Sequence, residues 1–240
     1  MAFSQNINYF DKNNESFADV NTGEFTFTCR VSGMDNNKGT IILLHGFPET
    51  SRMWVELINL LDINGYNIIA PNQRGYSSGA RPSKISDYSI EKLSKDIIDI
   101  ANEFKIDKFH LVGHDWGSAV GWHVVSNFSE RILTWSALSV PHLDAFMNSI
   151  LNDTNQQKKS EYINFFKKPF LPEVYFKIFS NKYLKQIWSK SSDDEINSYL
   201  KVFKQKRAIK SALNWYRANF KNNTNLIGEI SVPTLIIYGI

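Results

Sequence analysis

The sequence predicts an α/β protein with a mostly parallel, doubly wound sheet and an inserted helical lid. Up to residue 143, short apolar runs typical of buried parallel strands alternate with segments of helical spacing. Beyond it only helical stretches follow, until a strand pattern returns near residue 231. We therefore expect an α/β core over residues 1–143, a helical lid over residues 144–230, and the start of a C-terminal core segment over residues 231–240.

The core elements are expected in a regular order. Two strand-like segments lead the chain, and the polar turns between them favour an antiparallel hairpin. The following strand runs are continuously apolar, as in central parallel strands, and amphipathic helices separate them. The expected strands are residues 6–10, 25–31, 40–44, 67–70, 109–112 and 132–140, and the expected helices are residues 53–61, 88–104 and 118–125.

The expected lid is rich in aromatic residues and lysine. It has no clear strand signal, and an all-helical insertion between two sheet strands is interpreted as a cover over the strand ends. Its helical stretches are residues 161–168, 173–179, 196–203 and 212–220, and a strand follows at residues 233–238.

Composition bounds the function classes. With 240 residues, 42% of them hydrophobic, the chain suits one α/β domain with an insertion. The net charge of +3 is modest, and the lysine-rich run over residues 201–210 (KVFKQKRAIK) is interpreted as a solvated helix face rather than a nucleic-acid patch. Cys29 is alone, so no disulfide framework or zinc spacing exists.

Neither a secretory signal nor a membrane span is expected. The first residues lack a basic stretch followed by an apolar one, and no apolar run approaches the length of about 18 residues that a span needs. We therefore expect a soluble cytoplasmic protein with no nucleic-acid partner and no membrane partner, whose oligomeric state stays open.

The stretch HLVGHDWGSAVG over residues 110–121 has the form of a nucleophile elbow. An apolar strand run ends in GHDWG, and a buried helical run follows. The flanking glycines are needed because the turn is so sharp that its central residue is strained and its neighbours lack room for a Cβ. Asp115 is that central residue, where an esterase would carry Ser.

An aspartate at this position indicates a different reaction from that of a serine. A carboxylate with an ordinary pKa of about 3.9 is ionised at pH 7 and can attack saturated carbon without a base. Its natural targets are epoxides and carbon–halogen bonds, which open by displacement to leave an ester on Asp115. The alternative is that Asp115 only caps the helix that follows it.

Five motifs together resemble the α/β-hydrolase fold in its epoxide hydrolase branch, close kin to the haloalkane dehalogenases. They occur in the family's order, and the core ones fall at expected strand ends. The resemblance covers about residues 20–240. The motifs are HGFPE (45–49), NQRGYS (72–77), HLVGHDWG (110–117), LSVPH (138–142) and ALNWYRAN (212–219).

The resemblance implies a role for each residue of the expected site. Asp115 is the nucleophile, and the amides of Phe47 and Trp116 form an oxyanion hole. In the lid, the NWYR match identifies Tyr216 as one of two family tyrosines that bind the epoxide oxygen and protonate it on opening. A looser match, with Lys in place of the family's Gln, identifies Tyr162 as the second. Simple lid packing is the alternative for both.

The resemblance also implies a small apolar electrophilic substrate and water as partners, without cofactor or metal. Haloalkane dehalogenases usually bind the halide through an Asn in the HG-x-P loop and a Trp. Trp116 could serve as that Trp, but Phe47 supplies no side-chain donor. An epoxide is therefore favoured, with a haloalkane dehalogenase-like hydrolase as the alternative.

Other polar residues of the motifs are expected to support the site. Asn72 replaces the family's usual Asp beside a tight turn, and Glu49 has no identifiable partner carboxylate and is given no role. The residues expected to be structural are His45, Arg74, Gly75, His114 and His142.

The family's catalytic acid and histidine are expected beyond residue 240, together with the last strand and helix. Asp144 is the only in-chain candidate for a relocated acid, and it falls a few residues late. Three interpretations therefore compete. They are a C-terminally truncated epoxide hydrolase-like enzyme that does not turn over alone, a non-catalytic ligand-binding protein, and a decayed fragment.

Overall fold

The computed structural model describes residues 6–220 and 226–239, except for the side chains of residues 179–183 and 185. Its strands form one eight-stranded sheet in the order β1-β2-β3-β5-β4-β6-β7-β8. The pairs β1–β2, β2–β3 and β3–β5 are antiparallel. All further pairs in this order, from β5–β4 to β7–β8, are parallel. The strands are β1 (Ile7–Lys12), β2 (Glu15–Asn21), β3 (Thr26–Ser32), β4 (Thr40–Leu44), β5 (Asn67–Pro71), β6 (Phe109–His114), β7 (Ile132–Leu138) and β8 (Thr234–Ile237).

The N-terminal part differs from the expected hairpin. β2 lies between β1 and β3 and pairs with both, so the two strands predicted there do not pair with each other. The sequence of β2, ESFADVN, contains two acidic residues and few large apolar ones, which hid it. Its inward side chains are small: Ala18 and Val20 lie two residues apart on one face and are fully buried.

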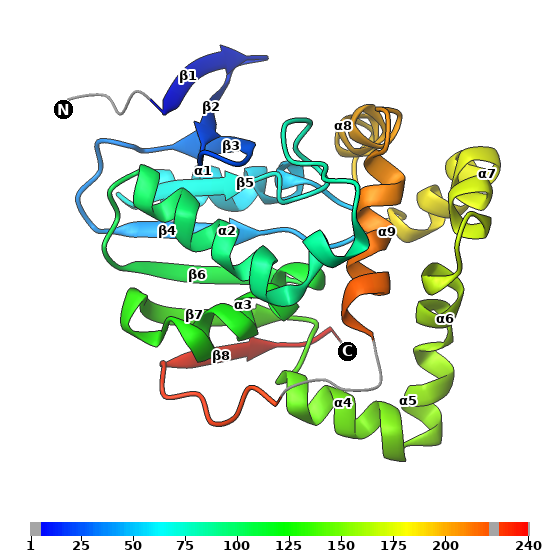
Figure 1. The fold of residues 1–240 in the computed structure, drawn as a ribbon. Coiled ribbons are helices and arrows are strands. Elements are labelled where there is room, and N and C mark those ends of the chain that lie inside the picture. The colour runs from blue at the N-terminus through cyan, green and yellow to red at the C-terminus, as the bar shows by residue number, and fades with distance from the viewer. Residues whose placement is uncertain (1–5, 221–225, 240) are drawn as a thin grey trace.

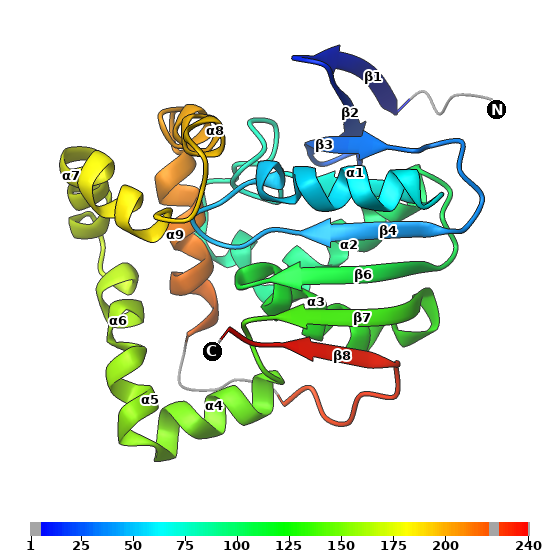
Figure 2. The same cartoon turned by 180° about the vertical axis from the view of Figure 1, so that it is seen from behind.

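Helices cover both faces of the sheet, as Figures 1 and 2 show together. α1 (Val55–Ile63) lies on one face, and α2 (Ile90–Glu103) and α3 (Trp116–Asn127) lie on the other. Successive side chains of β4 serve the two faces alternately. Leu43 packs with the core under α1, and Leu44 packs with the larger core under α2 and α3.

Between β7 and β8 the described chain forms only helices, here called the helical insertion. It lies beyond the carboxyl ends of the parallel strands, with α9 beside those ends and α7 far from the sheet (Figure 1). Among the described residues, no helix has both the length and the apolar character needed to cross a bilayer. The helices are α4 (Leu143–Asn152), α5 (Thr154–Lys159), α6 (Glu161–Lys167), α7 (Leu171–Ile187), α8 (Asp193–Phe203) and α9 (Ala208–Asn219).

Buried hydrogen bonds fasten α9 to the core. The Trp215 indole N–H donates to the Arg74 carbonyl at 2.9 Å, and the Tyr88 hydroxyl donates to the Ser211 hydroxyl at 2.8 Å. Because both ends of each bond are buried, breaking it would leave an unpaired polar group. These bonds therefore fix the position of α9 over the strand ends.

Candidate active site

Asp115 stands at the sharp turn between β6 and α3. Its φ of 51° and ψ of −120° are strained for a residue with a Cβ. Its N–H donates to the Leu138 carbonyl at 3.2 Å, and the Ser118 hydroxyl donates to the Gly113 carbonyl at 2.6 Å, so the turn is tied to both flanking strands. The Asp115 side chain makes no capping bond to α3. The structure therefore shows no side-chain capping bond in support of the helix-cap alternative.

Two glycines allow the elbow to approach the end of β4. A Cβ on Gly117 would collide with the carbonyl of Leu44, and a Cβ on Gly46 would collide with the side chain of Asp115. The absence of Cβ atoms at these positions lets the loop after β4 lie directly against the carboxylate. A Cβ on Gly113 would collide with the carbonyl of Gly117, so the sequence-based argument about the two glycines that flank the turn, Gly113 and Gly117, is confirmed.

The Asp115 carboxylate is half-buried at the cavity and held by backbone N–H groups. The Phe47 N–H donates to Oδ1 at 2.8 Å, and the Trp116 N–H also bonds to the carboxylate. Burial raises the pKa of Asp115 above its ordinary value, while the two amide bonds and the charge of His114 act to lower it. The site thus holds a desolvated carboxylate between donors that favour a negatively charged oxygen, as carboxylate nucleophiles require.

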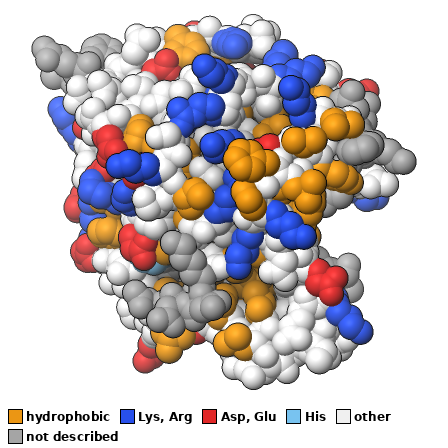
Figure 3. Space-filling view, turned by 45° about the vertical axis from the view of Figure 1, so that its right-hand side comes forward, with side chains coloured by type: hydrophobic (Ala, Val, Ile, Leu, Met, Phe, Trp, Pro, Cys, Tyr) orange, Lys and Arg blue, Asp and Glu red, His pale blue; other side chains and the backbone are white. Residues whose placement is uncertain are grey.

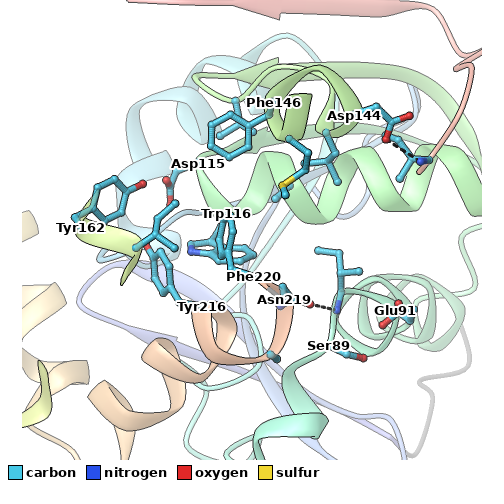
Figure 4. A pocket seen from close by; sticks show the side chains of 18 residues that line it. Ser89, Glu91, Asp115, Trp116, Asp144, Phe146, Tyr162, Tyr216, Asn219 and Phe220 are labelled. Atoms are coloured by element: carbon cyan, nitrogen blue, oxygen red, sulfur yellow. Dashed lines mark hydrogen bonds between the residues drawn. The ribbon is translucent and has the colours of Figure 1, made fainter. Parts of the chain in front are cut away.

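A cavity of about 280 Å³ opens in front of Asp115 and holds three more of the predicted site residues, Trp116, Tyr162 and Tyr216. Figure 4 shows the hydroxyls of both tyrosines turned toward the Asp115 carboxylate. Such a cavity suits a small, mainly apolar molecule. Its apolar lining consists of Ile90, Ala119, Val140, Leu143, Phe146, Met147, Ile163, Ala218, Phe220 and Ile227.

Tyr216 is buried over the nucleophile. Its ring centroid lies 5.0 Å from that of Trp116 and 5.6 Å from that of Phe47, both edge-to-face. Burial, with the charge of Asp115, raises the pKa of Tyr216 well above 10, so its hydroxyl is protonated at neutral pH. The next residue, Arg217, forms an ion pair at 2.7 Å with Glu173 of α7, which holds this part of α9 in place.

Tyr162 reaches the same cavity from α6. Its ring centroid is 6.3 Å from that of Tyr216, and the residue is 43% exposed, so it stands nearer the solvent than Tyr216 does. The Phe47 side chain, in contrast, does not line the cavity. It packs edge-to-face against Phe166, Phe176 and Phe203 of the helical insertion. Phe47 thus offers the site its amide and no side-chain donor.

An ion pair beside the nucleophile was not foreseen. His114 Nδ1 lies 3.1 Å from a carboxylate oxygen of Glu49, a residue to which the sequence assigned no role. Burial lowers the pKa of His114, but its hydrogen bond to Glu49 and the charges of Glu49 and Asp115 outweigh that effect and raise the pKa above 6.5. A positive charge on His114 in turn favours the ionised form of Asp115.

This pair should make stability depend on pH. The pKa of His114 is higher in the folded protein than in the unfolded chain, so its stabilising effect is complete below about pH 6.5 and is lost as the pH rises through the folded pKa. We expect His114→Asn to lower the free energy of unfolding by about 1 kcal/mol more at pH 5.5 than at pH 9. Thermal melting at the two pH values measures this, and Glu49→Gln should show the same pattern. Equal losses at both pH values would mean that His114 is neutral throughout.

Two of the residues discussed as support for the site, His45 and Asn72, form hydrogen bonds whose partners could not be predicted from the sequence. The buried His45 ring accepts from the Gln73 N–H at 3.2 Å, and burial lowers the pKa of His45 to about 4, so it is neutral. Asn72 Oδ1 accepts from the Ser51 N–H at 3.0 Å, so an amide oxygen serves where the resemblance implied a carboxylate.

Arg74 is held by a buried bidentate ion pair. Its guanidinium donates to the two carboxylate oxygens of Asp96 at 2.7 and 2.6 Å, and both side chains are almost fully buried. The pair joins the turn after β5 to α2. Arg74 therefore supports the turn, as expected, and does not line the cavity.

Asp144 and His142 hold the far end of the cavity. The Asp144 carboxylate accepts from the N–H groups of Ile227 and Gly228 at 2.9 and 3.1 Å. The His142 ring accepts from the Asp144 N–H at 3.3 Å, at the start of α4, and does not line the cavity. No histidine is among the described residues that line this cavity. The geometry thus gives Asp144 an anchoring role and offers no support for a relocated catalytic acid.

The described residues gather no cluster of three or more His, Cys, Asp or Glu side chains that could hold a metal ion.

Comparison with known proteins shows a family match and several similar proteins of known name. The alpha/beta hydrolase fold family matches residues 39–239. AB hydrolase superfamily protein YfhM of Bacillus subtilis (strain 168) is 34% identical, over 92% of this chain and 79% of its own. Epoxide hydrolase 3 of Xenopus tropicalis and epoxide hydrolase 4 of Homo sapiens are 28% and 29% identical over 87% of this chain. The chain spans 60% of the length of each of these two vertebrate proteins.

Solved structures agree in fold. An epoxide hydrolase of the alpha/beta hydrolase superfamily from hot-environment metagenomes is 25% identical, with a TM-score of 0.75 over 99% of this chain and 82% of its own. Epoxide hydrolase VrEH1 from Vigna radiata is 23% identical, with a TM-score of 0.70 over 98% of this chain and 80% of its own. These likenesses bear out the predicted fold class.

Proposed function

The chain belongs to the alpha/beta hydrolase fold family, and from this premise we propose that it is a hydrolase of the epoxide hydrolase type with Asp115 as its nucleophile. The observation that carries the proposal is the half-buried carboxylate of Asp115, whose backbone is strained; it accepts from the Phe47 N–H at 2.8 Å and faces the hydroxyls of two tyrosines. Several relatives are epoxide hydrolases, which supports an epoxide as substrate. We further propose that residues 144–230 act as the lid over a core formed by residues 1–143 and 231–240.

The first half of the reaction is an alkylation. The carboxylate oxygen of Asp115 that is not held by Phe47 attacks a ring carbon of the epoxide. The bond between this carbon and the epoxide oxygen breaks as the ester bond forms. The freed oxygen takes a proton from Tyr216, assisted by Tyr162. Because the pKa of Tyr216 is raised by its burial, this hydroxyl carries the proton that the oxygen needs.

The second half is hydrolysis of the ester. Water attacks the ester carbonyl carbon of Asp115, and the carbonyl oxygen becomes negatively charged while the Phe47 and Trp116 amides stabilise it. The carbon–oxygen bond to the product then breaks, and the departing oxygen takes the proton of the new carboxyl group, which releases a diol and restores the carboxylate. The proton removed from the water returns to Tyr216. A base must take the proton of the water. None of the five histidines of the 240-residue chain is among the residues that line the cavity.

The epoxide assignment is favoured over a haloalkane by the donors present. An epoxide oxygen needs a proton, which a tyrosine can give, whereas a departing halide needs N–H donors. The side chain of Phe47 offers none, so the Trp116 indole would have to hold the halide without a second donor from that loop. The halide therefore lacks the pair of donors that a dehalogenase uses.

The test compares two electrophiles on the same protein. We expect a small aryl epoxide to alkylate Asp115 roughly 10²-fold faster than a 1-haloalkane of similar size, the scale of general-acid help. Intact-mass spectrometry distinguishes the two, because an epoxide adds its whole mass and a haloalkane adds its mass less the hydrogen halide. Faster reaction with the haloalkane would favour a dehalogenase. A folded chain that reacts with neither would favour a ligand-binding protein.

A further inference from the structure

The outward face of α7 presents apolar side chains to solvent. Leu171, Val174 and Ile178 recur at helical spacing on that face and are 53%, 51% and 65% exposed, and Phe170, just before the helix, is 77% exposed. These four residues are here called the outer stripe. The opposite face of the same helix buries Phe176 almost completely against the insertion. A helix that is apolar on both faces is normally covered on both.

A row of cations lies beside the outer stripe. A hollow of about 500 Å³ separates α7 from the turn between α8 and α9, and five basic residues line it. Within the part of the chain that the structure describes, no carboxylate forms an ion pair with any of them. These residues, here called the basic rim, are Lys177, Lys204, Lys206, Arg207 and Lys210.

The charge of the basic rim is not compensated locally. The one carboxylate that lines the hollow, Glu173, binds Arg217 at 2.7 and 2.9 Å and so is already neutralised. Two more exposed cations, Lys167 and Lys168, come just before the outer stripe. Figure 3 shows Lys and Arg side chains interspersed with apolar ones on this side of the molecule.

We propose that this face of the helical insertion docks on the surface of an anionic phospholipid bilayer. The outer stripe enters the headgroup region, and the basic rim lies against the lipid phosphates. Exposed apolar side chains flanked by lysines are the pattern of a surface-bound helix, and each cation near such a bilayer adds to the attraction. A nucleic acid would use the cations but leave the outer stripe in water, so it fits this face less well.

The proposal concerns docking on a membrane surface, and a spanning helix has no part in it. The lysine-rich run over residues 201–210 was interpreted from the sequence as a solvated helix face only. The structure brings this run beside α7, which the sequence alone does not reveal. The expectation of no membrane partner rested on the lack of a spanning segment, which surface docking does not need. Docking is also independent of the catalytic proposal, since no residue of the outer stripe or the basic rim lines the Asp115 cavity.

Sedimentation with vesicles tests the proposal on the whole 240-residue chain. We expect binding to vesicles of equal parts phosphatidylcholine and phosphatidylglycerol, little binding to pure phosphatidylcholine, and weaker binding as salt rises. Val174→Asn with Ile178→Asn should weaken binding about tenfold or more. Lys204→Gln with Lys206→Gln should weaken it about 25-fold, at roughly fivefold for each cation. All four side chains are exposed, so the melting temperatures should not change.

The matched control is another exposed apolar strip. Leu235 and Ile237 on β8 are 56% and 47% exposed, and Leu235→Asn with Ile237→Asn should leave vesicle binding unchanged. Equal binding to neutral vesicles, no binding to anionic ones, or loss of binding in the β8 variant instead of the α7 variant would overturn the proposal. So would binding that needs the basic rim but not the outer stripe. If that binding extended to duplex DNA, the face would be a nucleic-acid surface.

Discussion

Asp115→Asn should remove covalent reaction with epoxides almost completely. In the parent chain we expect a small aryl epoxide to form one adduct per molecule, on the peptide that contains Asp115. An amide carries no negative charge and is a far weaker nucleophile, so the rate of adduct formation should fall by roughly 10³-fold or more. Asn is nearly the same size and keeps an oxygen that can accept from the Phe47 N–H, as Oδ1 of Asp115 does at 2.8 Å. A slower rate of adduct formation would therefore reflect the lost negative charge of residue 115 and not a change in the shape of its side chain.

The parent chain should stop after the first half of the reaction. The ester can be hydrolysed only if a base activates water, and no histidine is among the residues lining the cavity. We therefore expect the adduct to accumulate without diol, as peptide mass spectrometry and product analysis would show. Asp144→Asn is the matched control. That carboxylate is bound to the N–H groups of Ile227 and Gly228, so its loss should leave adduct formation intact. Steady diol production would mean that another group activates water.

The same adduct should form more slowly in acid. Only the ionised carboxylate attacks, and burial raises the pKa of Asp115 above its usual value. The rate should therefore rise with pH through a midpoint above the ordinary value of about 3.9 and then level off. A rate that is flat down to pH 4 would mean that the two amides and His114 outweigh burial.

The elbow could be predicted from sequence because its determinants are local. A strand, two glycines and a helix follow one another within residues 109–127, and the same stretch fixes where Asp115 must lie. The loop after β4 was predictable for a similar reason, since a strand end positions Phe47. The proposed division into a core and a lid rests on the change in hydrophobic period along the chain.

Ion pairs between residues that are far apart in the sequence could not be predicted in this way. His114 and Glu49 are 65 residues apart, and their pairing depends on side-chain directions that periodicity does not give. The Arg74–Asp96 pair joins a loop to a helix for the same reason. β2 was missed because its two fully buried side chains, Ala18 and Val20, are small, so that its hydrophobic signal is weak.

Replacing Tyr216 with Phe should slow alkylation by about 10²-fold, the scale of lost general-acid help. Its hydroxyl is buried and protonated beside Asp115, whereas Tyr162 is 43% exposed and offers a second hydroxyl from α6. Tyr162→Phe alone should therefore have a smaller effect, and the double variant should react more slowly than either single one. The rate of adduct formation measures this in a single turnover, so the result does not depend on hydrolysis.

The control must remove a buried tyrosine hydroxyl elsewhere in the insertion. Tyr199 on α8 is fully buried and does not line the cavity, so Tyr199→Phe should react at the parent rate. All of these variants keep their rings, and the contact of Tyr216 with Trp116 at 5.0 Å should hold the cavity in shape. A double variant that reacts as fast as the parent would show that both tyrosines only pack the lid. The proton would then have to reach the epoxide oxygen from water, and the epoxide assignment would lose the support of the helical insertion.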